Sequence, residues 1–379
     1  MSEGNLTWVE VKKDALKHNL AAFQKIAGPQ VKLMPVVKSN AYGHGMLGVA
    51  EIAGEFGVDY LGVVNLEEAL TLRINHIRTP LLVLSYFNPS GIEDALENNI
   101  ELTVYDRETV RKISEAAQKM NKPARLHVKV DTGTARLGVQ AKEAAEFIDD
   151  IKDIKGIELV GIFTHFADSE NDDWTYTNKQ IQEFKNLLFN LQKKNIVIPI
   201  THAACSAAAL SSADTHFNLI RIGISLYGLW PSEETKQKLA THCPWLELKP
   251  ALTWKTTIIQ IKDLEKGKPI GYGCSYTTKK ATKLAVIPVG YNEGYDRRLS
   301  NRGEVLIRGK RVPVLGRVCM NLTMIDVTSI AKVKAGEEVT LLGVQNGKEI
   351  SADEIAEKIE TINYEVVTRI NPLIPRIYI

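Results

Sequence analysis

The chain has 379 residues, of which 44% are hydrophobic and 24% are charged, and its formal net charge is +2. This length suits two or three domains, and the composition is that of a globular protein. The small net charge argues against the basic footprint of a nucleic-acid-binding domain, and no apolar run reaches the ~18 residues of a membrane-spanning helix.

Short apolar segments alternate with longer amphipathic ones over the first part of the chain. The apolar segments are rich in Val, Ile and Leu, as expected for strands buried on both faces. They are Val31–Val37, Tyr60–Val64, Leu81–Ser85, Glu101–Val104, Arg125–Val130, Leu159–Thr164, Pro199–His202 and Leu219–Ile224. Between most of them apolar residues recur at helical spacing, as in Arg107–Met120, Lys142–Ile151 and Thr177–Lys193. Eight such units predict a (β/α)8 TIM-type barrel over residues 12–235. A doubly wound open sheet is the alternative, less favoured because one rhythm persists through all eight units.

The rhythm changes after the eighth unit, where strand-like segments with alternating polarity follow one another. They include Trp254–Ile261, Lys283–Pro288, Glu304–Ile307 and Glu338–Leu342, separated by turn residues. We therefore expect a separate, mainly β domain over residues 236–379. The strand-like stretch 7–11 precedes the barrel and is a candidate to join that domain.

A lysine closes the first apolar segment, at Lys38, and a glycine-containing turn follows it. In this fold the C-terminal ends of the strands carry the chemistry, so Lys38 would face the barrel mouth. An isolated lysine at such a place is most often simply solvated. The alternative is a lysine that forms a Schiff base in a partly desolvated site, and the glycines favour it because backbone can approach a ligand there.

Later strands of the barrel end in further polar groups. These are Lys129 and Arg136 at the fifth, His165 at the sixth, His202 and Ser206 at the seventh, and Arg221, Gly223 and Ile224 at the eighth. Taken singly, each is common as a structural residue. Together they gather cations and imidazoles at one mouth, and the loops after the last two strands commonly bind phosphate.

A lysine, a phosphate cradle and the lack of an acidic metal cluster predict pyridoxal 5'-phosphate as the cofactor and no metal. This cofactor is an electron sink that needs a lysine and a partner for its ring nitrogen. Arg221 is placed to be that partner. Arginine is effectively never deprotonated, so it would leave the ring nitrogen unprotonated and the electron sink weak. Return of a proton to Cα would then outpace side reactions.

The lysine segment, PVVKSNAYGHG, resembles that of bacterial alanine racemases. Four further segments match the family in order and spacing: Gly271–Gly273, Val289–Tyr291, Gly316–Met320 and Thr361–Glu365. The resemblance covers nearly the whole chain. It implies an enzyme that interconverts L-alanine and D-alanine and supplies D-alanine for peptidoglycan.

The resemblance implies two opposed bases, Lys38 and Tyr272. Racemisation removes a proton on one face and delivers one on the other, and one group can hardly serve both faces of a planar intermediate. Tyrosine is a poor base at its reference pKa of about 10. The nearby cation Arg136 would favour the phenolate.

The resemblance also assigns the remaining groups. Arg221 meets the ring nitrogen, with His202 behind it, and His165 links Tyr272 to Arg221. Tyr42, Ser206, the Gly223 and Ile224 backbone and Tyr364 hold the phosphate. Arg136 lies near the cofactor's phenolic oxygen, Met320 presents its amide to the substrate carboxylate, and Lys129, carboxylated on its amine in many members, supports Arg136. A homodimer with shared active sites is implied, with Lys38 from one chain and Tyr272 and Met320 from the other.

Some positions depart from the common family pattern, namely Thr134, Ala135, Cys205, Asn292 and Asn321. None of them removes a catalytic group, so the reaction type implied by the resemblance is unaffected. They bear instead on which substrates are accepted. The alternative is a racemase of broader scope that also accepts serine. A fold-related decarboxylase would typically meet the ring nitrogen with a carboxylate. A non-catalytic pyridoxal-phosphate-binding protein would resemble the barrel alone.

The N-terminal residues carry charged side chains and lack the apolar segment of a signal peptide. The four cysteines are spaced too widely for a zinc or redox motif. We therefore expect free thiols in a reducing cytoplasm, a small-molecule substrate, and no nucleic-acid or membrane partner.

Overall fold

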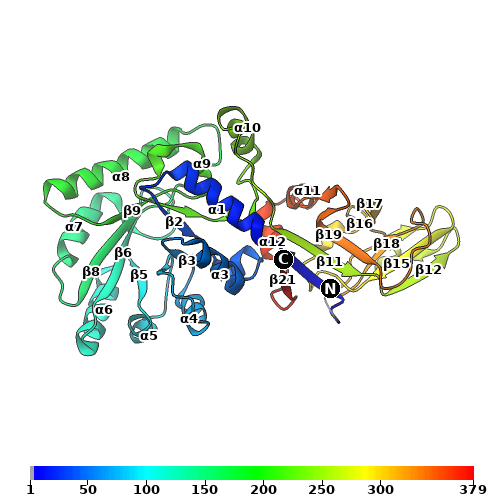
Figure 1. Cartoon of the computed structure of the whole chain (residues 1–379), viewed down its shortest axis with the longest axis horizontal. Coiled ribbons are helices and arrows are strands. Elements are labelled where there is room, and N and C mark those ends of the chain that lie inside the picture. Colours follow the sequence, from blue (N-terminus) through cyan, green and yellow to red (C-terminus); the bar gives the residue numbers. More distant parts are fainter. Residues whose placement is uncertain (1–3) are drawn as a thin grey trace. The chain divides into compact units, whose positions relative to one another are not determined.

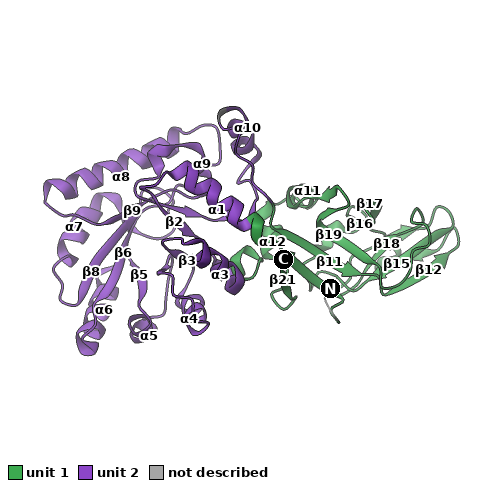
Figure 2. Ribbon diagram, in the orientation of Figure 1, with its two compact units in different colours: residues 1–15, 40–45, 250–379 green, residues 16–39, 46–249 purple. Residues whose placement is uncertain are grey.

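A computed structural model describes residues 4–379 of the chain. These residues divide into two compact units, coloured separately in Figure 2. The barrel unit holds Leu16–Ser39 and Met46–Lys249. The β unit holds the described residues up to Ala15, together with Asn40–Gly45 and Pro250–Ile379. The boundary expected at residue 235 lies inside helix α10 (Glu233–His242), and residues 236–249 group with the barrel unit.

Eight parallel strands of the described residues form the barrel (Figure 1). They are β2 (Lys32–Pro35), β3 (Leu61–Val63), β4 (Leu81–Val83), β5 (Ile100–Val104), β6 (Ala124–Asp131), β8 (Ile157–Phe163), β9 (Ile200–His202) and β10 (Leu219–Ile222). Their hydrogen-bonded order is β2-β10-β9-β8-β6-β5-β4-β3, and the short β7 (Val139–Gln140) pairs with β6. A bridge between Val36 and Gly62 nearly closes the ring. The predicted (β/α)8 barrel is confirmed.

Helix α1 (Lys13–Ala27) precedes the first of these strands, and further helices connect them. They are α3 (Met46–Phe56), α4 (Leu66–Ile74), α5 (Ile92–Glu97), α6 (Arg107–Met120), α7 (Ala141–Ile151), α8 (Thr175–Lys193) and α9 (Ser206–Ser211), with α10 after the last strand. No helix within residues 4–379 combines the length and the apolar character needed to cross a bilayer.

Helix α6 shows how the sequence sets an element's limits. Asp106 accepts a hydrogen bond from the backbone N of Thr109 at 2.8 Å and so caps the N-terminus. Asn121, with a left-handed φ of 50°, ends the helix. Val110 and Ile113 lie on its buried face. The predicted bounds and the observed ones coincide here.

The β unit is built on a sheet of order β17-β16-β19-β11-β1-β21, in which β20 pairs with β19. Its strands are β1 (Thr7–Val11), β11 (Leu252–Thr257), β16 (Glu304–Ile307), β17 (Lys310–Pro313), β19 (Glu338–Gln345), β20 (Lys348–Ile350) and β21 (Arg376–Tyr378). Strand β1 pairs antiparallel with β11 and parallel with β21, so the N-terminal strand is part of this unit.

A second sheet, of order β12-β15-β18, completes the β unit together with the hairpin of β13 (Pro269–Ile270) and β14 (Tyr276–Thr277). Its strands are β12 (Gln260–Leu264), β15 (Thr282–Ile287) and β18 (Thr323–Asp326). The stretch Trp254–Ile261, predicted as one strand, is therefore two. Ile258 N bonds to Glu337 O and Ile259 N bonds to Val286 O, each at 2.9 Å, because the chain changes sheets at this point.

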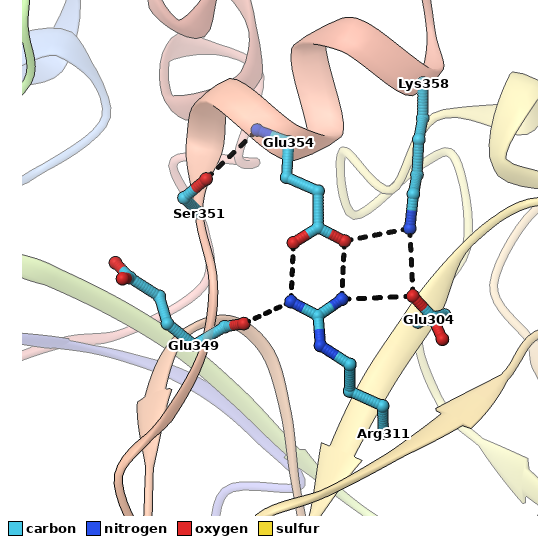
Figure 3. A network of polar contacts seen from close by, with 6 residues as sticks. All are labelled: Glu304, Arg311, Glu349, Ser351, Glu354 and Lys358. Atoms are coloured by element: carbon cyan, nitrogen blue, oxygen red, sulfur yellow. Dashed lines mark hydrogen bonds and ion pairs between the residues drawn. The ribbon is translucent and has the colours of Figure 1, made fainter.

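Helices α11 (Ala352–Lys358) and α12 (Asn363–Thr368) lie near the C-terminus, and a polar network attaches α11 to the strands (Figure 3). Arg311 of β17 donates to both carboxylate oxygens of Glu354, at 2.6 and 2.7 Å. Lys358 bridges Glu354 and Glu304, at 2.9 and 3.1 Å. The bidentate geometry ties the first turn of α11 to the β16–β17 hairpin.

Candidate active site

The candidate residues fall in both units. The barrel unit contains Lys38, Lys129, Arg136, His165, His202, Ser206, Arg221, Gly223 and Ile224, and the β unit contains Tyr42, Tyr272, Met320 and Tyr364. Those of the barrel unit follow or occupy the C-terminal ends of its strands, as the sequence predicts.

Lys38 follows β2 and opens a single turn of left-handed helix, α2 (Lys38–Tyr42). The four residues Ser39 to Tyr42 have φ between 51° and 54°. For a residue with a side chain this conformation costs roughly 1–2 kcal/mol, and such strain clusters at functional sites. The Ser39 amide donates to Glu68 Oε1 at 2.6 Å, which helps to hold the turn. The left-handed backbone conformation after Lys38 therefore costs conformational free energy, which the rest of the fold must offset.

The charge state of Lys38 is set by its surroundings. Burial lowers the pKa of its ammonium group, the charge of Arg136 lowers it further, and Glu68 acts in the opposite direction. An amine that loses its proton more readily is a better nucleophile and a better base. Lys38 therefore has the properties of a lysine that attacks a carbonyl.

Lys129, on β6, lies in the same cationic environment. Burial and the charges of Arg136, Arg221 and Lys38 lower the pKa of Lys129 to about 8. Its Nζ lies 5.3 Å from the centre of the Phe163 ring. A lysine with this pKa is partly neutral at physiological pH, and only the neutral amine can react with carbon dioxide.

Arg221, on β10, is 4% exposed and makes hydrogen bonds to backbone and imidazole groups. Its Nη2 donates to Thr164 O at 2.9 Å and to Ala203 O at 2.7 Å. Its Nη1 donates to Nδ1 of His202 at 2.8 Å. Burial lowers the pKa of Arg221 to about 10, so the guanidinium remains a cation at neutral pH.

Two imidazoles flank this guanidinium. Nδ1 of His165 lies 3.3 Å from Nη2 of Arg221. Burial, and then the charge of Arg221, lower the pKa of both His165 and His202 well below the usual value. Both rings are therefore neutral at physiological pH, and each can accept a hydrogen bond from Arg221.

The loops after β9 and β10 are tied together by one hydroxyl. Ser206 Oγ, at the start of α9, accepts hydrogen bonds from Gly223 N at 2.9 Å and from Ser225 N at 3.4 Å. Ile224 begins a short 3-10 turn (Ile224–Tyr227). The buried Ser225 Oγ has no hydrogen-bond partner within residues 4–379. Backbone amides and hydroxyls thus gather after the last two strands, as an anion site requires.

The loop that carries Arg136 begins at Asp131, whose Oδ1 accepts hydrogen bonds from the amides of Gly133 and Thr134 at 2.9 and 2.8 Å. Thr134 Oγ1 donates to His165 O at 2.5 Å. Ala135 adopts a left-handed φ of 54°, a conformation that glycine adopts without cost. Of the two departures from the family pattern in this loop, Thr134 therefore adds a hydrogen bond that holds the loop, and Ala135 adds a strained backbone conformation.

In the β unit, Tyr42 and Tyr364 lie close together, with ring centres 6.2 Å apart. Tyr272 follows Gly271, whose φ is 70°, and is 73% exposed. Met320 is 57% exposed. Such large exposed side chains are available to a ligand or to another chain.

Two further residues at the barrel site were not singled out in the sequence. Glu101 of β5 and His127 of β6 are buried, and Glu101 Oε2 lies 2.8 Å from Nε2 of His127. Nδ1 of His127 lies 3.2 Å from Nε2 of His202. The sequence did offer one signal for this pair, because Glu101 places a carboxylate in an otherwise apolar strand segment.

Comparison with known proteins identifies close relatives. Two family models match: "Alanine racemase, N-terminal domain" over residues 11–231 and "Alanine racemase, C-terminal domain" over residues 251–378. An alanine racemase of Methanococcus maripaludis is 43% identical and covers 98% of each chain. The structure of alanine racemase from Clostridium difficile 630 superposes with a TM-score of 0.93 at 36% identity, covering 99% of this chain and 96% of that one. Alanine racemase from Bartonella henselae "with covalently bound pyridoxal phosphate" gives 0.86 at 27% identity, covering 99% and 100%.

Proposed function

The chain belongs to the alanine racemase family of pyridoxal-phosphate-dependent isomerases, and we propose that it racemises alanine on that cofactor with Lys38 and Tyr272 as its two bases. The observation that carries the proposal is the cationic site at the barrel mouth. There a buried guanidinium, Arg221, lies among neutral imidazoles, and the pKa values of Lys38 and Lys129 are lowered.

The residues fit the three functional groups of pyridoxal phosphate. Lys38 supplies a readily deprotonated amine for the aldehyde. Arg221 can only donate hydrogen bonds, which suits an unprotonated ring nitrogen. The Ser206 and Ser225 hydroxyls and the Ile224 amide, in the turn that Gly223 opens, supply donors for the phosphate. When bound, the cofactor acts as an electron sink and makes the α-proton of an amino acid acidic.

Three groups manage the proton in this proposal. Lys38 removes it from one face of Cα as a neutral amine, or returns it there as the ammonium that it then becomes. Tyr272 serves the opposite face, because one base cannot reach both. Arg136 favours the tyrosine's phenolate by its positive charge. Arg221 keeps its own protons, so Cα remains the site where the proton returns.

The substrate proposal is alanine, with Met320 offering its backbone amide to the carboxylate. The Thr134, Cys205 and Asn321 departures leave serine as the second candidate. A purified sample loaded with pyridoxal phosphate should convert L-alanine to D-alanine and the reverse, measured by chiral chromatography. Equal rates with L-serine would favour the broader racemase. No conversion of either amino acid would refute the proposed function.

We propose a homodimer with shared active sites as part of this function. Its support is that Tyr272 and Met320, which the proposal places at the site, are exposed in the single chain. Mixing Lys38→Ala with Tyr272→Ala under subunit exchange should then restore up to about a quarter of the wild-type rate. Half of the randomly formed dimers are mixed, and each has one intact site of two. No recovery, with exchange shown independently, would refute sharing.

A cytoplasmic location also belongs to the proposal. Its support is that all four cysteines are free thiols, which is usual in a reducing compartment. Fractionation of the source cells with an antibody against the chain would test it, and recovery outside the cytoplasm would contradict it.

A further inference from the structure

A line of hydrogen bonds crosses the interior of the barrel behind Arg221. It runs from Arg221 Nη1 to His202 (2.8 Å), from His202 to His127 (3.2 Å), and from His127 to Glu101 (2.8 Å). The interior of such a barrel is normally filled by branched aliphatic side chains. Placing two imidazoles and a carboxylate there is costly unless each polar atom is paired.

The direction of each bond follows from donor chemistry. Arginine has only donors, so Nδ1 of His202 must accept from Arg221. The single proton of the neutral His202 ring is then on Nε2, which donates to Nδ1 of His127. Nε2 of His127 carries the next proton and donates to the Glu101 carboxylate. A carboxylate only accepts, so it can end this line without a conflict of donors.

The barrel makes room for these rings. Gly161 of β8 lies beside His127, and a Cβ atom at Gly161 would lie 2.0 Å from Nδ1 of His127. Phe163, two residues along the same strand, stacks on His202 with ring centres 4.6 Å apart and planes 9° apart. A glycine inside a strand marks a close approach, and here it admits the imidazole that joins Glu101 to His202.

Glu101 also supplies a negative charge. The Arg221 guanidinium bonds to two carbonyls and to imidazoles, and no ion pair with a carboxylate is found for it within residues 4–379. Burial tends to raise the pKa of Glu101, but the hydrogen bond from His127 and the hydrogen bond and charge of Arg125 outweigh burial and lower it. The carboxylate at the end of the line is therefore ionised.

We propose that Glu101 is a positioning residue for the racemase reaction: through His127 and His202 it keeps Nδ1 of His202 an acceptor for Arg221, and so holds the guanidinium in position toward the cofactor's ring nitrogen. The positioning role rests on the proposed function, because it concerns the racemase reaction. The line of bonds itself lies wholly within the barrel unit.

Glu101→Gln is the most informative change because it keeps the shape of the side chain. Glu101 accepts from His127, from Arg125 Nε at 2.8 Å and from Tyr60 OH at 3.3 Å. A glutamine amide must turn its NH2 group toward at least one of these donors. Arg125 and Tyr60 share one oxygen of Glu101, and arginine can only donate. The amide oxygen of the glutamine therefore faces them and its NH2 group faces His127, which loses its acceptor and changes tautomer.

The measurement is nitrogen-15 NMR of ring-labelled histidine in the cofactor-free protein, which contains only eight histidines. His127→Gln and His202→Gln identify the two sets of signals. Wild type should show both rings neutral with the proton on Nε2. Glu101→Gln should move the His127 signals toward a mixture of tautomers, and racemisation by the loaded enzyme should fall roughly 10–100-fold, as when outer partners of metal-bound histidines are removed.

Arg125→Gln is the matched control. It removes the half-exposed guanidinium from Glu101 but leaves the carboxylate and His127 in place, so the tautomers and the racemisation rate should stay as in wild type. Glu101→Asp, which keeps an acceptor, should restore the wild-type signals. Gly161→Ala should disturb both histidines without touching a charge.

Unchanged His127 and His202 signals in folded Glu101→Gln would overturn the proposal, as would an equal loss of activity in Arg125→Gln. If Glu101→Gln does not fold, the wild-type spectrum alone still tests the proposal. A proton on Nδ1 of His127 or of His202 would be incompatible with the line of hydrogen bonds and would overturn it. The NMR result needs neither cofactor nor activity. A wild type that racemises nothing would therefore refute the proposed function while the line of bonds stands.

Discussion

Replacing Arg221 by lysine preserves the buried charge but removes the planar fork that distributes it. The guanidinium donates to Thr164 O, Ala203 O and His202 Nδ1 from two different nitrogens. A lysine ammonium has one nitrogen and cannot reach both sides of this site. At least one buried acceptor is left without a donor, at a cost of about 1–3 kcal/mol, and a charged hydrogen bond worth about 1.5–3 kcal/mol weakens.

We therefore expect Arg221→Lys to lower the free energy of unfolding by roughly 2–4 kcal/mol, measured by urea denaturation of the cofactor-free protein. Arg107→Lys is the control, because Arg107 forms an exposed pair with Asp150 and surface changes usually stay within about 0.5 kcal/mol. A loss below about 1 kcal/mol for Arg221→Lys, similar to that of the control, would refute the view that the fork satisfies buried acceptors.

Three further predictions follow from the site and the fold. Lys38→Ala should abolish the borohydride-reducible link to the cofactor, checked by peptide mass spectrometry; a reduced adduct at another lysine would contradict the assignment. Lys129, whose pKa is lowered to about 8, should carry a carboxyl group when carbon-13 bicarbonate is supplied, seen as a carbamate NMR signal that Lys129→Ala removes; a bare amine in well-ordered density would contradict it. Hydrogen bonds from Arg311 lower the pKa of Glu354 to about 2, so the stability that Glu354 contributes to the fold is complete above its unfolded pKa of about 4 and is lost as pH falls through about 2. Glu354→Gln should therefore cost roughly 1 kcal/mol at neutral pH and nothing at the acid limit, and a pH-independent difference between the two urea curves would disprove the linkage.

The barrel could be read from the sequence because its strands are short apolar segments of one type, each followed by a helix with clear limits. Helix α6 is the plainest case, since Asp106 and Asn121 mark both of its ends. The β unit was harder to predict. Ile258 continues the alternation of β11, and only the pairing partners of Ile258 and Ile259 reveal that the chain moves to another sheet there.

The same contrast holds for the site. Lys38, His165 and Arg221 could be found because each follows or closes a strand, where barrels place their chemistry. Glu101 and His127 lie inside the barrel, and their contact depends on strand register. His127 pairs with Gly161 across β6 and β8, a match that no local pattern encodes. Electrostatic effects, such as the lowered pKa of Lys129, likewise arise only when separate strands bring charges together.

The most direct test of the central claim, two bases on opposite faces of Cα, is solvent exchange in Tyr272→Phe. The loaded variant is incubated in deuterated water with D-alanine or L-alanine, and deuterium at Cα is followed by NMR together with the chirality of the product. With Lys38 intact, one enantiomer should exchange its α-proton with retention while the other does not, and racemisation should fall by about 10²-fold or more. Exchange of both enantiomers with undiminished racemisation would contradict the two-base account.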